Sequence, residues 1–322
     1  MRRTRPAFKR SWLHLSWAAI LPACGATPGP SGFGAVTDGG DPLQGAADAA
    51  PPILSGGRDG GTLGDGATTG PTADCSDAAK LVYVISDQNT LYSFAPNTLK
   101  FTPIGALRCP TSDTVNSMAV DRSGTAWVNF TDGKLYRVST KDASCATTSF
   151  APNQAGFTNE LGMGFSSDSP GSKSETLFVS DNAGLGVAKV DLGSMSLTAL
   201  GPYTGTESGA NAELTGTGDA RLFGFFATSP AAFAEIDKAT AATPKVTPLT
   251  SVNASEGGYA FSFWGGDFWF YTAFPTPSSP DATTSVTHYV SATGAASVVL
   301  ANIGFVIVGA GVSTCAPTAP PR

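Results

Sequence analysis

The sequence of 322 residues predicts an all-β fold, a β-propeller of five blades with four antiparallel strands in each. Residues 116–151 have the pattern of four short strands joined by tight turns, and a meander of this length needs similar neighbours to bury its faces. Its aromatic second strand recurs at a spacing of about 45 residues, which is typical of propeller blades. The recurrences are LVYVI at Leu81, AWVNF at Ala126, TLFVS at Thr176, RLFGFF at Arg221 and DFWFY at Asp267. An irregular β-sandwich also accommodates short strands with glycine and proline turns, but the regular spacing favours the propeller.

The best-defined unit lies within residues 116–151. Its strands carry alternating, aromatic and β-branched residues, and its turns carry Asp and Gly, which turns prefer. The pair Asp132 and Gly133 is a strong hairpin signal between two such strands. The unit is therefore expected to hold strands at residues 117–120, 125–130, 134–139 and 146–150.

The first unit begins directly with its second strand at Leu81, so its first strand must come from elsewhere. The run IGFVIVGAGVS at residues 303–313 follows the fifth unit and has no later strand to complete. We expect it to pair into the first blade and close the ring, which removes an open edge. A sixth blade remains an alternative if residues 161–201 contain an additional hairpin.

Residues 1–23 have the features of a secretion signal, a basic start followed by an apolar core too short to span a bilayer. Residues 21–24, LPAC, resemble the lipobox of bacterial lipoproteins. The resemblance implies that Cys24 becomes the new N-terminus, carries acyl chains such as palmitate and anchors the protein in the cell envelope. A glycine follows it rather than an aspartate, so the outer membrane is expected. The alternative is cleavage without lipidation, after Ala23 or Ala26.

The remaining chain divides into three parts by composition. Residues 24–74 contain Gly, Ala, Pro, Thr and Asp with almost no large apolar residue, so they are expected to form a disordered tether behind the lipidated cysteine. Residues 75–316 carry the repeated units and form the predicted propeller. Residues 317–322 are expected to be an unstructured tail.

Four cysteines remain beyond Cys24, an even set that is typical of disulfides in an exported protein and allows three pairings. Topology favours one of them. Cys75 precedes the first blade and Cys315 follows the closing strand, so a bridge between them would lock the ring. Cys109 and Cys145 lie near the fourth strands of adjacent blades and form the second expected pair.

Charge and histidine content exclude several kinds of site. The chain has a net charge of −6, and five of its positive charges lie in the predicted signal, so a basic nucleic-acid-binding surface is not expected. His288 is the only histidine beyond the signal, which excludes a metal site with several histidines. We expect His288 to be a half-exposed strand residue.

An acid or an amide stands directly before each predicted first strand, and first strands line the channel of a propeller. Carboxylate and amide oxygens in one ring suit a hard cation such as calcium. In the alternative interpretation, these polar residues bind no cation and only solvate the loops that enter the channel. The five candidates are Asn116, Glu160, Glu213, Glu256 and Asn302.

The run AVDRSGTAWV at residues 119–128, followed by KLYRVS, resembles the blade signature of the NHL, two-component-regulator and virginiamycin B lyase propellers. The chain is also similar to uncharacterised lipoproteins of myxobacteria, in which a tether rich in Gly and Ala precedes cysteine-bounded blades. The lyase's catalytic histidine could match only His288, in a third strand. Gluconolactonase and regucalcin propellers hold a divalent metal at the channel mouth, where the five candidate residues match by position in the blade.

Together these features predict a propeller at the cell envelope that acts as a binding or interaction module for a protein or glycan, without catalysis. Its apolar candidates for a ligand are the aromatic residues of the fifth unit, most of which are expected to lie between blades: Phe263, Trp264, Phe268, Trp269, Phe270 and Tyr271. One alternative is a calcium-dependent hydrolase or lactonase with a carboxylate of the ring as general base. Another alternative is a structural scaffold.

Overall fold

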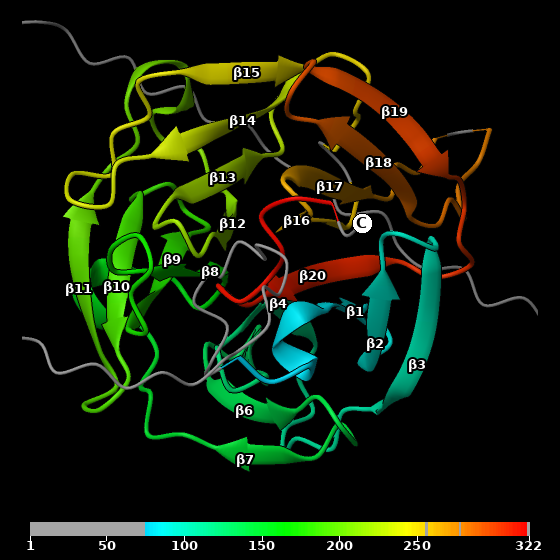
Figure 1. Cartoon of the computed structure of the whole chain (residues 1–322). Helices are drawn as coiled ribbons and strands as arrows, with labels where there is room; N and C mark the ends of the chain where they lie inside the picture. Colours follow the sequence, from blue (N-terminus) through cyan, green and yellow to red (C-terminus); the bar gives the residue numbers. More distant parts are fainter. Residues whose placement is uncertain (1–74, 255–256, 277, 321–322) are drawn as a thin grey trace, which may run out of the picture. The chain divides into compact units, whose positions relative to one another are not determined.

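The computed structural model describes residues 75–254, 257–276 and 278–320, and these residues form a five-bladed β-propeller (Figure 1). Each blade is a sheet of four antiparallel strands, so the predicted fold and blade number are confirmed. The part of the chain at residues 161–201 holds four strands and no additional hairpin, which excludes the sixth blade. Among the described residues, no helix is both long and apolar enough to cross a membrane.

The strands follow the sequence units, with four of them supplied to each blade in chain order except in the first. Blade 1 contains β20 (Ile307–Val312), β1 (Val82–Ser86), β2 (Thr90–Ala95) and β3 (Lys100–Ala106). Blade 2 contains β4 (Val115–Val120), β5 (Thr125–Phe130), β6 (Leu135–Ser139) and β7 (Cys145–Thr147). Blade 3 contains β8 (Leu161–Ser167), β9 (Glu175–Asp181), β10 (Val187–Asp191) and β11 (Ser196–Gly201).

The last two blades are built in the same way, and short 3-10 helices occur in the loops. Blade 4 contains β12 (Glu213–Gly216), β13 (Leu222–Phe226), β14 (Ala231–Ile236) and β15 (Val246–Leu249). Blade 5 contains β16 (Tyr259–Trp264), β17 (Asp267–Thr272), β18 (Ser285–Val290) and β19 (Ala295–Leu300). The 3-10 helices are η1 (Ala78–Lys80), η2 (Gln154–Gly156) and η3 (Gly205–Glu207).

The C-terminal strand closes the ring, as the sequence predicted. β20 pairs antiparallel with β1, and Val312 lies opposite Val82 while Gly309 lies opposite Ile85. The pairing gives blade 1 an inner strand drawn from the far end of the chain (Figure 1). The strand starts at Ile307, four residues later than the start of the predicted run at residue 303.

The inner strands β4, β8, β12, β16 and β20 surround the channel and approach one another to backbone contact. A Cβ atom at Gly162 of β8 would collide with the carbonyl oxygen of Ala212, at the start of blade 4. A Cβ atom at Gly164 would lie 2.8 Å from the carbonyl carbon of Leu214. Glycine is therefore required in β8 because it lets neighbouring inner strands pack this closely.

The apolar core consists of layers between neighbouring blades. Alternate residues of one strand face opposite neighbours, so Phe223 and Phe225 of β13 pack toward blade 5, whereas Leu222 and Phe226 pack toward blade 3. Five clusters of this kind fill the five junctions. A single blade cannot bury both faces, and the closed ring supplies each face with a partner.

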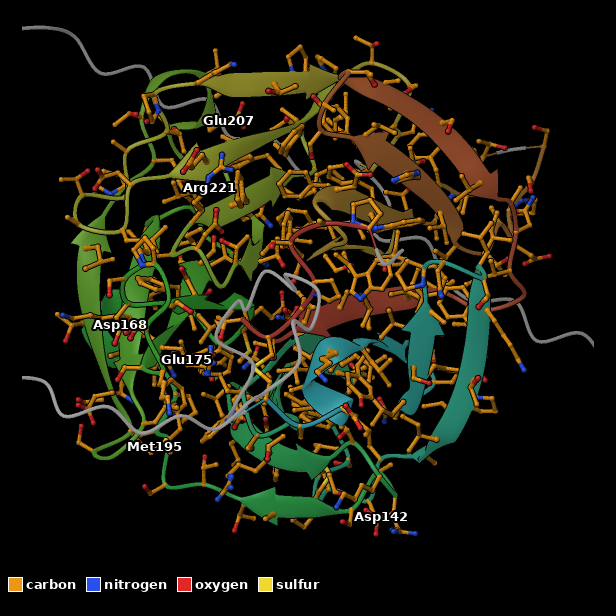
Figure 2. The ribbon with its side chains drawn as sticks, in the orientation of Figure 1. Asp142, Asp168, Glu175, Met195, Glu207 and Arg221 are labelled. Carbon is orange, nitrogen blue, oxygen red and sulfur yellow. A yellow bond between two sulfur atoms is a disulfide. The ribbon has the colours of Figure 1, made fainter. Side chains whose placement is uncertain are left out.

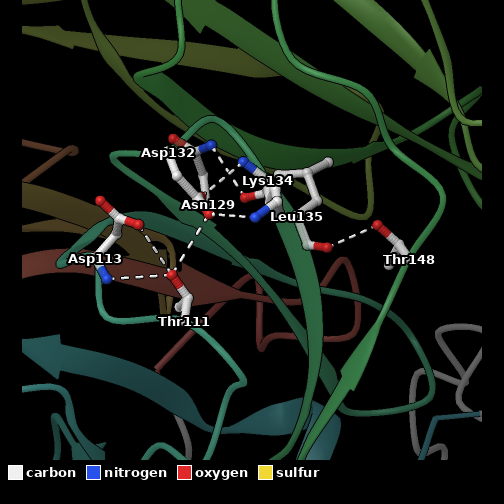
Figure 3. Close-up of polar contacts among 7 residues, drawn as sticks. All are labelled: Thr111, Asp113, Asn129, Asp132, Lys134, Leu135 and Thr148. Carbon is white, nitrogen blue, oxygen red and sulfur yellow. Dashed lines mark hydrogen bonds and ion pairs between the residues drawn. The ribbon is translucent and has the colours of Figure 1, made fainter.

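The hairpin predicted at Asp132 and Gly133 joins β5 to β6 (Figure 3). Gly133 adopts φ of 81°, which favours glycine. The Asp132 carboxylate accepts hydrogen bonds from the backbone N–H of Lys134 at 3.0 Å and from its ammonium group at 2.9 Å. Burial acts to raise the pKa of Asp132, but the bonds from Lys134 prevail and lower it. The turn is therefore fixed by its own side chains.

Two disulfides join the cysteine pairs that the sequence predicted. Cys75 is bonded to Cys315 across a sequence separation of 240, and Cys109 is bonded to Cys145 across a separation of 36. The first bridge lies at the ring closure, because Cys315 follows β20 and Cys75 precedes β1. It holds the two chain segments of blade 1 together covalently.

We expect the double substitution Cys75→Ser, Cys315→Ser to lower the free energy of unfolding by about 5 kcal/mol, and Cys109→Ser, Cys145→Ser to lower it by about 4 kcal/mol. The longer loop restricts the unfolded chain more. Urea denaturation of the oxidised protein and the two variants measures both losses. A greater loss from the shorter loop would show that local contacts, rather than loop length, set the contribution.

Candidate functional site

A polar surface lies at the channel end where the inner strands begin, and we call it the asparagine mouth. It contains Asn116, Asn159, Glu160, Asn182, Asn211 and Tyr259. The Asn182 amide donates to Glu160 Oε2 at 2.7 Å, and the Asn211 amide donates to Asn182 Oδ1 at 2.5 Å and to the Tyr259 hydroxyl oxygen at 2.9 Å. Beside this chain of bonds lies an open depression of about 490 Å³.

The structure brings two of the predicted ring residues to this mouth. Asn116 donates to Asn129 Oδ1 at 2.9 Å and to the backbone carbonyl of Leu161 at 3.2 Å, so it ties β4 to β8. Glu160 is the residue directly before β8 and is bonded to Asn182. Their polar groups therefore link neighbouring blades and loops.

Glu213 lies inside the channel rather than at its mouth. Its Oε2 accepts a hydrogen bond of 2.6 Å from the Ser117 hydroxyl, so the side chain reaches from β12 to β4. Burial raises the pKa of Glu213 well above its usual range, against the hydrogen bonds from Ser117 and the backbone of Met163 that lower it. The neutral acid is therefore favoured, and it fills the centre of the ring.

The other two predicted ring residues do not join this group. Asn302 is exposed in the loop between β19 and β20, and its N–H donates to Ser285 Oγ at the start of β18. It lies there because β20 starts at Ile307, so Asn302 does not directly precede the inner strand. Glu256 lies outside the described residues, as does Cys24. Within residues 75–254, 257–276 and 278–320, no three or more His, Cys, Asp or Glu side chains form a group suited to a metal ion.

His288 is a partly exposed residue of the third strand of blade 5, as the sequence predicted. Its Nε2 lies 2.9 Å from Asp267 Oδ2, and its ring stacks on Trp269 with centroids 4.1 Å apart. Both contacts are within blade 5, away from the residues of the asparagine mouth.

A groove of about 520 Å³ lies between blades 4 and 5, and we call it the 4–5 groove. Its floor is aromatic and consists of Phe223, Phe233, Phe263, Phe268 and Tyr289. Its rim carries two basic and two acidic residues, Arg221, Lys245, Glu235 and Asp237. A volume in this range, with an apolar floor and a few polar groups, is typical of ligand sites.

Successive side chains of strands β13 and β14 point to opposite faces of the sheet, and those on one face line this groove. Phe223 lies opposite Glu235 in the β13–β14 ladder, and Arg221 directly precedes β13. The Arg221 guanidinium donates to both carboxylate oxygens of Glu235, at 3.0 and 2.8 Å, and it lies 4.7 Å from the centre of the Phe223 ring. Figure 2 labels Arg221. Both charged side chains are 49% exposed, so they remain accessible to a ligand.

The aromatic residues of the fifth unit are divided between two junctions. Phe268 and Phe270 pack toward blade 4, and Trp269 and Tyr271 pack toward blade 1. The expectation that most of them lie between blades is confirmed, and Phe263 and Phe268 contribute to the groove. No local sequence signal joins them with Arg221, Glu235 and Lys245, because these residues come from another blade.

The opposite end of the channel carries the Cys75–Cys315 bridge, and we call it the disulfide mouth. Glu175 of β9 accepts hydrogen bonds there from the backbone N–H of Arg122 and from the Thr314 hydroxyl, both at 2.7 Å (Figure 2). The Arg122 guanidinium donates to Thr314 Oγ1 at 2.9 Å and to Cys75 Sγ at 3.5 Å. Three blades are thus tied together at the ring closure.

Burial raises the pKa of Glu175 to about 7, and the neighbouring Asp121 also raises it, against the hydrogen bonds from Arg122 and Thr314 that lower it. The folded protein therefore binds more protons than the unfolded chain between the ordinary value of 4.5 and about 7. The stability that Glu175 contributes is complete below pH 4.5 and is lost as the pH rises through about 7.

We expect Glu175→Gln to melt at the same temperature as the unsubstituted protein near pH 4.5 and at a higher temperature at pH 8, because the amide stays neutral while the buried carboxyl must ionise. Thermal melts across this pH range measure the difference. The control is Asp281→Asn, which makes the same kind of change at an exposed side chain. A Glu175→Gln curve parallel to that of the unsubstituted protein would contradict the assignment.

No protein-family model matches the chain, and no curated protein matches its sequence. One similar solved structure is a protein of unknown function from Bacteroides caccae, at 9% identity and a TM-score of 0.46, over 72% of this chain and 98% of that one. Another is a chain of a nidogen–laminin complex, at 11% identity and a TM-score of 0.45, over 72% and 97%. The extracellular domain of a putative one-component system from B. thetaiotaomicron has 13% identity and a TM-score of 0.38, over 68% and 29%. These similarities do not assign a role to any residue of this chain, and they do not identify a ligand.

Proposed function

We propose that the protein is an exported binding module that recognises a segment of a partner protein in the 4–5 groove. The observation that carries this proposal is the combination of an aromatic floor with accessible rim charges in a groove of about 520 Å³. The two disulfides favour an extracellular or periplasmic location. The lipobox-like LPAC sequence supports anchoring of Cys24 in the outer membrane, with residues 25–74 as the tether.

The geometry of the groove favours a protein segment over a glycan. Sugar rings bind on exposed aromatic faces, but Phe223 lies under the Arg221 guanidinium, and Phe223, Phe263 and Phe268 are each less than a tenth exposed. An apolar side chain inserted at the floor fits this arrangement better. Arg221 and Glu235 form an ion pair with each other in the free protein, and each can instead pair with an oppositely charged residue of the segment.

A metal-dependent hydrolase finds less support. Its ring would need the carboxylates of Glu160, Glu213 and Glu256 to face one another. The Glu213 carboxyl is instead engaged with Ser117 inside the channel, and burial raises its pKa. The proposed binding role therefore assigns no part to calcium.

We expect peptides selected by display on the purified protein to carry an aromatic or aliphatic residue beside a charged one. Tyr289→Ala should weaken their binding at least tenfold, since truncation of an aromatic anchor typically costs about 1–2 kcal/mol or more. Lys245→Glu should discriminate against peptides with acidic residues. Isothermal titration calorimetry measures both effects.

The matched control is Asn182→Ala at the asparagine mouth, which should leave peptide affinity unchanged. Loss of binding in the control with no loss in Tyr289→Ala would move the site to the channel mouth. Binding of arrayed glycans without any selected peptide would replace the protein partner with a carbohydrate.

A further inference from the structure

The outer strand of each blade has one edge that no neighbouring strand of its own sheet covers. These strands are β3, β7, β11, β15 and β19. Backbone N–H and C=O groups along such an edge can pair with another chain, so proteins protect them with charges, prolines, short strands or covering groups. The five edges of this propeller differ in how they are protected.

Three of the edges are protected by composition or length. β3 carries Lys100 and Pro103. β7 has only three residues, and β15 has four residues including Pro248. None of these offers a long, uncharged run for pairing.

One side chain covers the beginning of the β11 edge. The Gln154 amide nitrogen donates to the backbone carbonyl of Met195 at 3.0 Å, and its Oε1 accepts from the backbone N–H of Leu197 at 3.1 Å. One primary amide thus occupies a donor and an acceptor of the strand edge, as a neighbouring backbone would. A partner strand cannot pair there without displacing Gln154.

β19 has none of these protections. Its six residues, AASVVL, contain neither a charge nor a proline, and the flanking sequence from residue 291 to residue 302 is also uncharged. Val298 is 56% exposed, more than any other large apolar side chain among the described residues. Within that part of the chain, no side chain or loop donates or accepts a hydrogen bond at residues 296–300 outside the ladder with β18. The pairing of β19 with β18 shifts register near Val299. β3 and β11 show the same kind of shift at the equivalent end of the strand, so it does not distinguish the edge of β19 from theirs.

We propose that β19 is the contact surface of a reversible homodimer, in which the β19 strands of two copies pair antiparallel about a twofold axis. Charge favours a second copy as the occupant. The chain has a net charge of −6, so two copies repel each other overall, and the run at residues 291–302 offers a contact to which neither copy contributes a charge. An antiparallel pair of identical strands is also self-complementary, as a twofold interface requires.

The extent of the strand limits the strength of the association. A six-residue strand pair is smaller than a standard interface of about 1,600 Å² of buried surface, so the dimer is expected to be weak and to depend on concentration. Two exposed Val298 side chains near the axis add apolar contact to the backbone bonds.

The test is sedimentation velocity of the protein over a range of concentrations up to the millimolar range. The unsubstituted protein should shift from monomer toward dimer as its concentration rises. Val298→Lys places a charge on the edge in each copy and should abolish the shift. Leu185→Lys is the matched control, because it adds the same charge at a side chain that is 48% exposed on another blade, and it should associate like the unsubstituted protein.

A second measurement uses Val298→Cys, which should give a disulfide-linked dimer under mild oxidation while Leu185→Cys should not. A protein that stays monomeric at every concentration would overturn the proposal. Equal association of the Val298→Lys and Leu185→Lys variants would overturn it as well, because the contact would then lie elsewhere. Melting temperatures of the variants verify that each remains folded.

Discussion

The pairing of β20 with β1 is the interaction on which the propeller depends. Each blade buries its faces only against two neighbours, so an open ring would leave the apolar layers beside blades 1 and 5 exposed to water. The closure is reinforced from outside by the Cys75–Cys315 bridge and by the bonds of Arg122 and Glu175 to Thr314. The two ends of the propeller domain are thus joined by strand pairing, by a disulfide and by hydrogen bonds.

The closed ring also determines what the channel can contain. Glycines in β8 bring the inner strands into backbone contact, and the Glu213 carboxyl spans the remaining space to reach Ser117. Burial raises the pKa of this carboxyl group because it disfavours the charged form, and the hydrogen bonds from Ser117 and the backbone of Met163 act in the opposite direction. The centre of the molecule is therefore a structural element, and a partner can reach only its outer surfaces, which include the two mouths, the grooves between blades and the edges of the outer strands.

Much of the fold could be predicted from local sequence signals. The second strand at Thr125–Phe130 and the hairpin at Asp132 and Gly133 follow from residue types over a few positions, and the closing strand follows from the incomplete first unit. The candidate site could not be predicted in the same way. The 4–5 groove joins Arg221 of one blade to Tyr289 of the next, and only the packing of two sheets brings them together. The sequence places Glu160 and Glu213 in equivalent positions before a predicted strand, but in the structure Glu213 is the first residue of β12 and its side chain reaches Ser117, whereas Glu160 stays before β8 and is bonded to Asn182.

The arrangement of polar groups supports the proposal that a partner binds between blades rather than on the propeller axis. At the asparagine mouth, Asn182 and Asn211 are bonded to Glu160 and Tyr259, so a ligand would have to replace bonds that the protein already makes. At the disulfide mouth, the backbone carbonyl of Pro317 accepts a hydrogen bond from Gly265, and the segment after β20 lies against the turn of blade 5. In the 4–5 groove, by contrast, Arg221 and Glu235 are half exposed, and their pairing in water stabilises the free protein little. A partner that supplies opposite charges and an apolar side chain would therefore replace this pair at small cost, which is why we propose the groove as the binding surface.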